Sequence, residues 1–174
     1  MPLIKLFFDI CLLRKGPQDL PASGLLLGLT IFANLVVSVV LLGLETDWAD
    51  AVIQALVGGA MLLGFLFITL RVAGLMPRFL QTSIAMLGSD ALISSFAVPL
   101  LAMMIVASPD EKSADAFLLI LKTIFLIMML WYVAVLAHIL RHALSRPLGI
   151  ALALAIVYVL ASVQVMSLLF APPA

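Results

Sequence analysis

One carboxylate, Asp90, lies inside a long apolar stretch of the chain, residues 78–106. A charged group at the centre of a membrane helix costs about 2.5 to 3.5 kcal/mol, so an acid in such a place is a candidate for function. Asp90 is the candidate intramembrane functional acid, a group that binds and releases a proton or an ion. An alternative stays open, in which Asp90 is a packing contact between helices or lies near the interface because its helix begins late. The partners for such a contact are Ser89, Ser94 and Asn34.

Lys122 is a cation within another apolar stretch, but its depth does not match that of Asp90. In two antiparallel helices the two residues differ in depth by about 15 Å at 1.5 Å of rise per residue. A lysine near the end of a membrane helix extends its ammonium group toward the surface. We therefore expect Lys122 to reach the outer interface near Asp115 and not to pair with Asp90.

Two histidines, His138 and His142, have the i,i+4 spacing that lets two imidazoles share a metal ion. No Cys, Asp or Glu accompanies them in that turn, and Arg141 lies between them. The pattern therefore favours a basic turn that faces anionic lipid headgroups. Cys11 is the single cysteine, which excludes an internal disulfide and a cysteine-based cluster. We predict neither a metal site nor a cofactor.

Motifs of soluble enzymes are absent from the sequence, which has no Gly-rich phosphate loop, no GxSxG and no HExxH. Enzymes that act within the membrane need paired acids, a Ser/His pair or a metal motif, and one Asp supplies none of these. An enzyme that acts on lipid lacks its paired catalytic groups for the same reason. We predict a protein that is not an enzyme.

The composition is that of an integral membrane protein. Of the 174 residues 66% are hydrophobic and 10% are charged, and the mean hydropathy is +1.33. In soluble domains roughly a quarter of the residues are charged. A formal net charge of zero gives no sign of a nucleic-acid partner, so the lipid bilayer is the expected surrounding. The apolar runs predict five transmembrane helices at about 23–44, 51–70, 82–106, 116–140 and 148–170.

Residues 1–22 precede the first span and predict a different element. Leu3, Leu6, Phe7, Ile10 and Leu13 recur at helical spacing, while charged side chains interrupt the run on another face. This is the pattern of an amphipathic helix that lies in the membrane interface, and we expect it to end at Gly16-Pro17. The predicted fold is an all-α membrane bundle of five transmembrane helices preceded by this interfacial helix.

The positive charges fall on one side of a five-span topology. Two basic turns supply most of them, with Arg71, Arg78, Arg141, His142 and Arg146. The other side holds only Lys112 and the near-interface Lys122, together with the acidic residues around the first and second outer loops. By the positive-inside rule the amino terminus is cytoplasmic and the carboxyl terminus is not. In a bacterium the expected location is the inner membrane.

Small residues at helical spacing mark faces where two helices approach closely. In the second span Ala51, Ala55 and Gly59 lie four apart, and Ala60 and Gly64 repeat that spacing. The fifth span has a similar pair, Ala151 and Ala155, and Gly88 lies beside Asp90. We predict that these residues pack against neighbouring helices, within the chain or in a partner.

Residues 58–101 resemble the bacterial Yip1-domain pattern. They form an apolar span, a Gly-containing basic turn, an R-F-x-Q-T-like start of the next helix and a small-residue continuation with a proline. The residues that carry the resemblance are Gly74, Arg78, Phe79, Gln81, Thr82, Gly88 and Pro99. The resemblance implies membrane organisation and trafficking through partner binding, as in eukaryotic members that engage Rab GTPases. Asp90 has no counterpart in that pattern.

Two functions follow as hypotheses. The first is a non-enzymatic scaffold or adaptor of the Yip1-like type, which associates laterally with other membrane proteins or with itself. It derives from the short loops, the small-residue faces and the resemblance. The alternative is a small proton- or ion-coupled transporter, or a subunit of one, in which Asp90 titrates. The effect of Asp90→Asn on activity separates the two hypotheses.

Overall fold

The computed structural model describes residues 3–107 and 116–170, and within them every regular element is helical. Five helices are long and apolar enough to cross a membrane, which confirms the predicted all-helical architecture. They are α2 (Gly24–Leu42), α3 (Trp48–Val72), α4 (Phe79–Ala107), α5 (Ala116–Leu144) and α6 (Leu148–Leu169). A short helix α1 (Leu3–Cys11) and the 3-10 turns η1 (Pro17–Asp19) and η2 (Met76–Arg78) complete the described chain.

The ends of the long helices follow local chemistry. Ser23 caps α2, because its side chain accepts a hydrogen bond from the backbone N–H of Leu26. Helix α4 begins earlier than the predicted residue 82, since η2 leads directly into it. Pro147 precedes the first residue of α6 and does not lie in its first turn. The predicted acidic loop with Lys112 and Asp115 lies outside the described residues.

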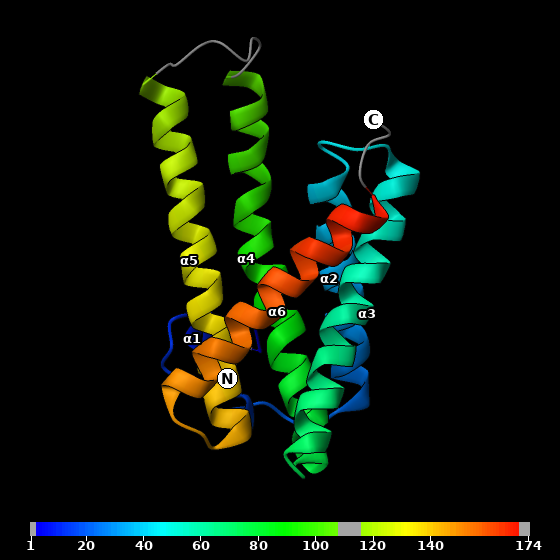
Figure 1. Cartoon of the computed structure of the whole chain (residues 1–174), viewed down its shortest axis with the longest axis vertical. Coiled ribbons are helices and arrows are strands. Elements are labelled where there is room, and N and C mark those ends of the chain that lie inside the picture. The colour runs from blue at the N-terminus through cyan, green and yellow to red at the C-terminus, as the bar shows by residue number, and fades with distance from the viewer. Residues whose placement is uncertain (1–2, 108–115, 171–174) are drawn as a thin grey trace.

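Helix α4 is the central element of the bundle, and it packs against α1, α2, α3 and α5. Figure 1 shows α4 and α5 side by side, α2 and α3 across from them, and α6 running obliquely in front of the other helices. Residues 82–89 of α4 are all buried. Pro99 is accommodated within the same helix. The outer faces carry exposed large apolar side chains, for example Leu25, Val106 and Leu168, which is what a lipid-facing surface requires.

Helices α1, α3 and α5 end in the same way. In each, a residue with positive φ follows the last turn, namely Leu13 (60°), Gly74 (69°) and Ser145 (51°). The next N–H then bonds a carbonyl five residues earlier, as in the Schellman motif. The bonds are Arg14 to Asp9 (2.9 Å), Leu75 to Leu70 (2.8 Å) and Arg146 to Arg141 (3.2 Å). The predicted end of the first helix at Gly16-Pro17 is wrong, because the chain already leaves the helix at Leu13.

Helix α1 packs one face onto α4 and α5. Leu6, Ile10 and Cys11 are buried, whereas Leu3 and Leu13 of the predicted apolar face are exposed. Leu13 lies beyond the end of the helix, so it does not continue that face. The buried side of α1 is therefore covered by other helices of this chain.

Three side chains of α4 and α5 bind the backbone of the last residue of α1 and of the segment that follows it. The Trp131 indole donates to the Cys11 carbonyl at 2.9 Å and the Gln81 amide to the Leu20 carbonyl at 2.8 Å. His138 Nε2 lies 3.0 Å from the Lys15 carbonyl oxygen. Backbone carbonyls that would otherwise need water find partners inside the bundle. The amino-terminal segment is thus attached to the core at three points.

Basic and acidic residues of the described turns lie at opposite ends of the bundle. The end that we call the basic end holds the α3–α4 and α5–α6 turns, with Arg71, Arg78, Arg141, His142 and Arg146. The other end, which we call the acidic end, holds the α2–α3 turn with Glu45, Asp47 and Asp50. Helix α6 starts at the basic end and finishes at the acidic end, as Figure 1 shows for its course.

Candidate functional site

Asp90 lies in the middle part of α4, and its carboxylate accepts a hydrogen bond from the side-chain amide of Asn34 in α2 at 2.5 Å. Leu26, Thr30 and Asn34 repeat at i,i+4 and are the buried residues of α2. This stripe brings the Asn34 amide to Asp90, because α2 packs along α4. Of the contacts that the sequence allowed, Asn34 is the one formed within the described residues.

Two tyrosines complete the polar centre of the bundle. Tyr132 of α5 and Asp90 line one cavity, and Tyr158 of α6 and Asp90 line another. Tyr158 is buried and its ring packs on Phe65, with the ring centroids 4.9 Å apart. Three helices, α2, α5 and α6, therefore each place one of these polar side chains against Asp90 or in a cavity that Asp90 lines. Sequence reasoning did not single out either tyrosine as a site residue.

The larger cavity has a volume of about 370 Å³ and extends from Asp90 toward the acidic end. On α2 it is lined from Asn34 to Leu42, and on α6 from Tyr158 to Met166. Each of these spans of eight residues rises by about 12 Å. Polar side chains recur along the wall, namely Ser38, Gln54 and Ser162. The cavity therefore extends from Asp90 along α2 and α6 toward the acidic end, with polar side chains in its wall.

The smaller cavity, about 200 Å³, lies on the other side of Asp90 between α4 and α5. Its wall is mainly apolar, with Leu41, Ile93, Ala97, Phe125, Met128 and Met129. Ser94 and Tyr132 are its other polar residues besides Asp90. Asp90 thus borders two cavities.

Toward the basic end, the segment of α4 that precedes Asp90 is packed on all sides. Residues 82–89 of α4 are buried without interruption, and Gly88 lies against the Phe7 ring. The hydroxyl oxygens of Ser83 and Ser89 are buried and have no hydrogen-bond partner in the described part of the chain. The cavities around Asp90 and the basic end are separated by this packed segment.

Cys11 lies beside Ser89 at the same level of the bundle. Its side chain is 1% exposed, and this burial raises the pKa of the thiol. A raised pKa keeps the thiol protonated and unreactive near neutral pH. Cys11 therefore behaves as a packed apolar residue.

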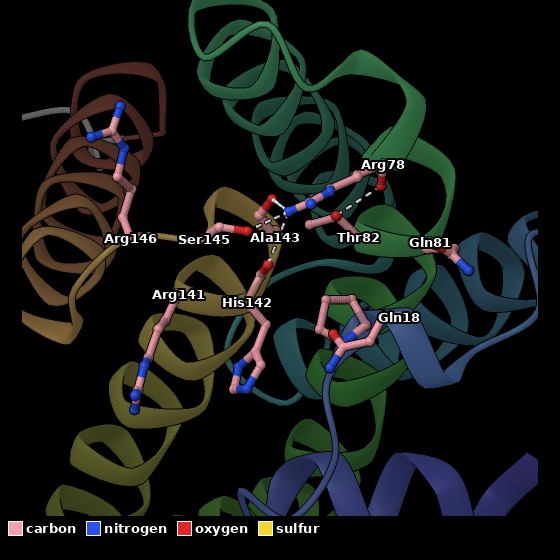
Figure 2. A pocket seen from close by; sticks show the side chains of 10 residues that line it. Gln18, Arg78, Gln81, Thr82, Arg141, His142, Ala143, Ser145 and Arg146 are labelled. Carbon is pink, nitrogen blue, oxygen red and sulfur yellow. Dashed lines mark hydrogen bonds between the residues drawn. The ribbon is translucent and has the colours of Figure 1, made fainter.

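The predicted basic residues divide between two surroundings. Arg71 is exposed and stacks over the Phe67 ring, 5.9 Å from its centroid. The other four, Arg78, Arg141, His142 and Arg146, line a cavity at the basic end, together with Gln18 and Gln81. Figure 2 shows this cavity from close by.

His138 and His142 lie side by side, with ring centroids 4.4 Å apart. Their inner contacts are to backbone carbonyls, since His142 Nδ1 lies 2.9 Å from the His138 oxygen and His138 Nε2 contacts Lys15. Among residues 3–107 and 116–170, no group of three His, Cys, Asp or Glu side chains is placed to hold a metal ion. The two rings act in packing and in capping carbonyls.

The predicted helix-packing residues also differ in their surroundings. Ala51, Ala55, Ala151 and Ala155 are buried. Gly59 and Gly64 are half-buried, with nothing within 4 Å of an added Cβ. Ala60 is exposed, as is Lys122 on α5. The four buried alanines pack within the chain, whereas the other part of the α3 pattern, Ala60 and Gly64, is not buried.

Comparison with protein-family models, with curated proteins and with solved structures gave no match to this chain.

Proposed function

We propose that this chain is a non-enzymatic multi-span membrane protein that binds a proton or a small cation at Asp90, as a transporter or as a subunit of one. The observation that supports this most is the position of Asp90 at the inner end of a partly polar cavity that runs to the acidic end. A carboxylate that served only to hold two helices together would need no such cavity beside it.

The surroundings of Asp90 suit a proton or a small cation. The cavity has room for roughly ten water molecules at about 30 Å³ each, so a hydrated ion or a chain of waters fits. Asn34 and the two tyrosines offer neutral hydrogen-bonding groups and no compensating positive charge. The carboxylates of the acidic end raise the local concentration of cations at the cavity mouth.

Access to Asp90 is proposed to be one-sided in this conformation. The positive-inside rule assigns the basic end to the cytoplasm, so the amino terminus is cytoplasmic and the carboxyl terminus is not. In a bacterium this is the inner membrane. The cavity then opens outward and residues 82–89 close the cytoplasmic side. Transport requires a second conformation in which this segment of α4 moves relative to its neighbours.

The test uses the full chain reconstituted in liposomes with a trapped pH-sensitive dye and an imposed proton gradient. Asp90→Asn keeps the size of the side chain but removes the titrating group, and we expect it to abolish the flux while yield and helix content stay unchanged. Asp50→Asn, which removes an exposed carboxylate at the acidic end, is the matched control and should retain most of the flux. Full flux in Asp90→Asn overturns the proposal. So does an unmodified chain that carries no proton, Na⁺ or K⁺ flux.

A scaffold or adaptor is the second candidate, and the uncovered part of α3 favours it. Ala60 is exposed, and Gly64, which is half-buried, has nothing within 4 Å of an added Cβ in the described part of the chain; small residues of this kind suit close helix contacts in membranes. The partner would be a second copy or another membrane protein, as the resemblance to the Yip1 family implies. Ala60→Leu should then abolish a cross-link formed in native membranes, whereas Leu126→Ala on α5 should leave it intact.

A further inference from the structure

A cavity of about 490 Å³ lies at the basic end, away from Asp90. It is bordered by η1, the first turn of α4 and the last turn of α5, and Figure 2 shows these three segments converging around it. Three arginines and one histidine line it, and among the described residues no carboxylate belongs to its wall. The neutral donors Gln18, Gln81 and Ser145 are also in the wall. Its chemistry is that of a site for an anion.

The fold builds this cavity from segments that are far apart in the sequence. Gln81 bonds the Leu20 carbonyl at 2.8 Å, which fixes η1 and Gln18 next to α4. The left-handed Ser145 ends α5 and the bond from Arg146 to the Arg141 carbonyl holds the turn. The wall is therefore set by hydrogen bonds that are already in place before any ligand binds.

Arg78 removes the main electrostatic objection to an anion at this place. The carboxyl end of a helix carries partial negative charge, and α5 ends in the cavity wall. The Arg78 guanidinium donates through Nη1 to the carbonyls of His142 (3.3 Å) and Ala143 (2.8 Å) and to the Ser145 hydroxyl (2.8 Å). These contacts use one nitrogen, and the rest of the guanidinium stays available to a ligand.

The cationic charge of the cavity is not neutralised within the described residues. The ion pair found among the described residues joins Lys15 and Asp19 at 4.0 Å, and neither residue lines the cavity. Arg141 and Arg146 are exposed, and in Figure 2 their side chains extend on the opposite side of the cavity from Gln18 and Gln81. Long arginine side chains on the rim can turn toward a bound anion, whose oxygens match the planar guanidinium fork.

We propose that this cavity binds a phosphate group, carried either by an anionic phospholipid headgroup or by a soluble phosphate compound. Membrane-spanning helices end here, which is the level at which headgroups lie. Leu148, exposed at the start of α6 beside Arg146, offers an apolar surface to an acyl chain. The site does not depend on the function of Asp90, because residues 82–89 separate the two cavities.

The experiment compares two double variants of the full chain that lose the same charge. Arg141→Gln/Arg146→Gln removes two arginines of the cavity, and Arg14→Gln/Arg71→Gln removes two exposed arginines that do not line it. Arg78 is left in place because it caps α5. Native mass spectrometry in neutral detergent measures the binding of phosphatidylglycerol against phosphatidylcholine. In a second arm, inorganic phosphate is added without lipid and thermal unfolding is followed.

We expect phosphatidylglycerol to bind more tightly than phosphatidylcholine, and the cavity variant to lose that affinity by about tenfold or more, since each charge-assisted hydrogen bond is worth roughly a factor of ten. The control variant should change it less than about twofold. If the cavity variant keeps its lipid affinity but loses the thermal stabilisation by inorganic phosphate, the site is assigned to a soluble phosphate compound. Equal losses of affinity in both double variants overturn the proposal. So does the absence of binding of both phosphatidylglycerol and inorganic phosphate.

Discussion

The contact between Gly88 and Phe7 sets up a test of how α1 is held. A Cβ added at Gly88 would overlap the Phe7 ring, so Gly88→Ala forces the ring to move from its place between α1 and α4. Overpacking of this kind costs about 1 to 3 kcal/mol. Alanine also favours a helix over glycine by about 1 kcal/mol. We expect Gly88→Ala to lower the free energy of unfolding by about 0 to 2 kcal/mol in the unmodified chain.

The sign should reverse when the ring is removed. In a Phe7→Ala background only the helix preference remains, so Gly88→Ala should stabilise by up to about 1 kcal/mol. The coupling between the two positions is then about 1 to 3 kcal/mol. Gly64→Ala is the control, because nothing lies within 4 Å of its added Cβ. Its effect should be the same in both backgrounds to within about 0.5 kcal/mol.

The assay is unfolding by sodium dodecyl sulfate in mixed micelles, followed by circular dichroism for the four variants of the cycle and for the control. A coupling within about 0.5 kcal/mol of zero would refute the docking of α1 through Gly88. An equal coupling for Gly64 would show that Phe7→Ala disturbs the bundle as a whole, and it would refute the local reasoning.

Three further predictions concern the same core. Because burial raises the pKa of the Cys11 thiol, maleimide at pH 8 should react with Cys11 far more slowly than with the exposed position in Cys11→Ala/Ala22→Cys, and equal rates would contradict the packing. Trp131→Phe removes the bond to the Cys11 carbonyl and should cost about 1 kcal/mol in the same unfolding assay; no change would count against that bond. Asn34→Leu leaves the Asp90 carboxylate without its donor and should cost about 1 to 3 kcal/mol, whereas Asn34→Leu/Asp90→Leu should recover most of it. A double variant with a lower free energy of unfolding than the single variant contradicts that pairing.

The long helices could be predicted from the sequence because each one alone satisfies the constraint that a bilayer imposes. A run of about 20 apolar residues is needed to cross it, and such runs are visible without knowledge of their neighbours. Ser23 as a cap could be predicted for the same local reason. Asp90 stood out because a carboxylate in an apolar run is costly wherever the helix packs.

Contacts between distant segments could not be predicted in this way. Tyr158 has no local signal that separates it from other aromatic residues of the long helices, and its place beside the cavity results from the oblique course of α6. The docking of the amino-terminal segment depends on Trp131, Gln81 and His138, which lie far along the chain and contact backbone carbonyls of residues 11–20. A backbone acceptor carries no mark in the sequence.

The packed segment of α4 links the amino-terminal helix to Asp90. Residues 82–89 close the bundle on one side of the carboxylate, and Gly88 within them touches Phe7 of α1. If Asp90 exchanges a proton or a cation with the basic end, this segment must separate from its neighbours, and α1 is one of them. The bond from Trp131 to the Cys11 carbonyl at the end of α1, and the bond from Gln81 to the Leu20 carbonyl further along the chain, would then oppose that opening. Under the proposed function, the energy that holds α1 in place would therefore contribute to the barrier between the two sides of the bundle.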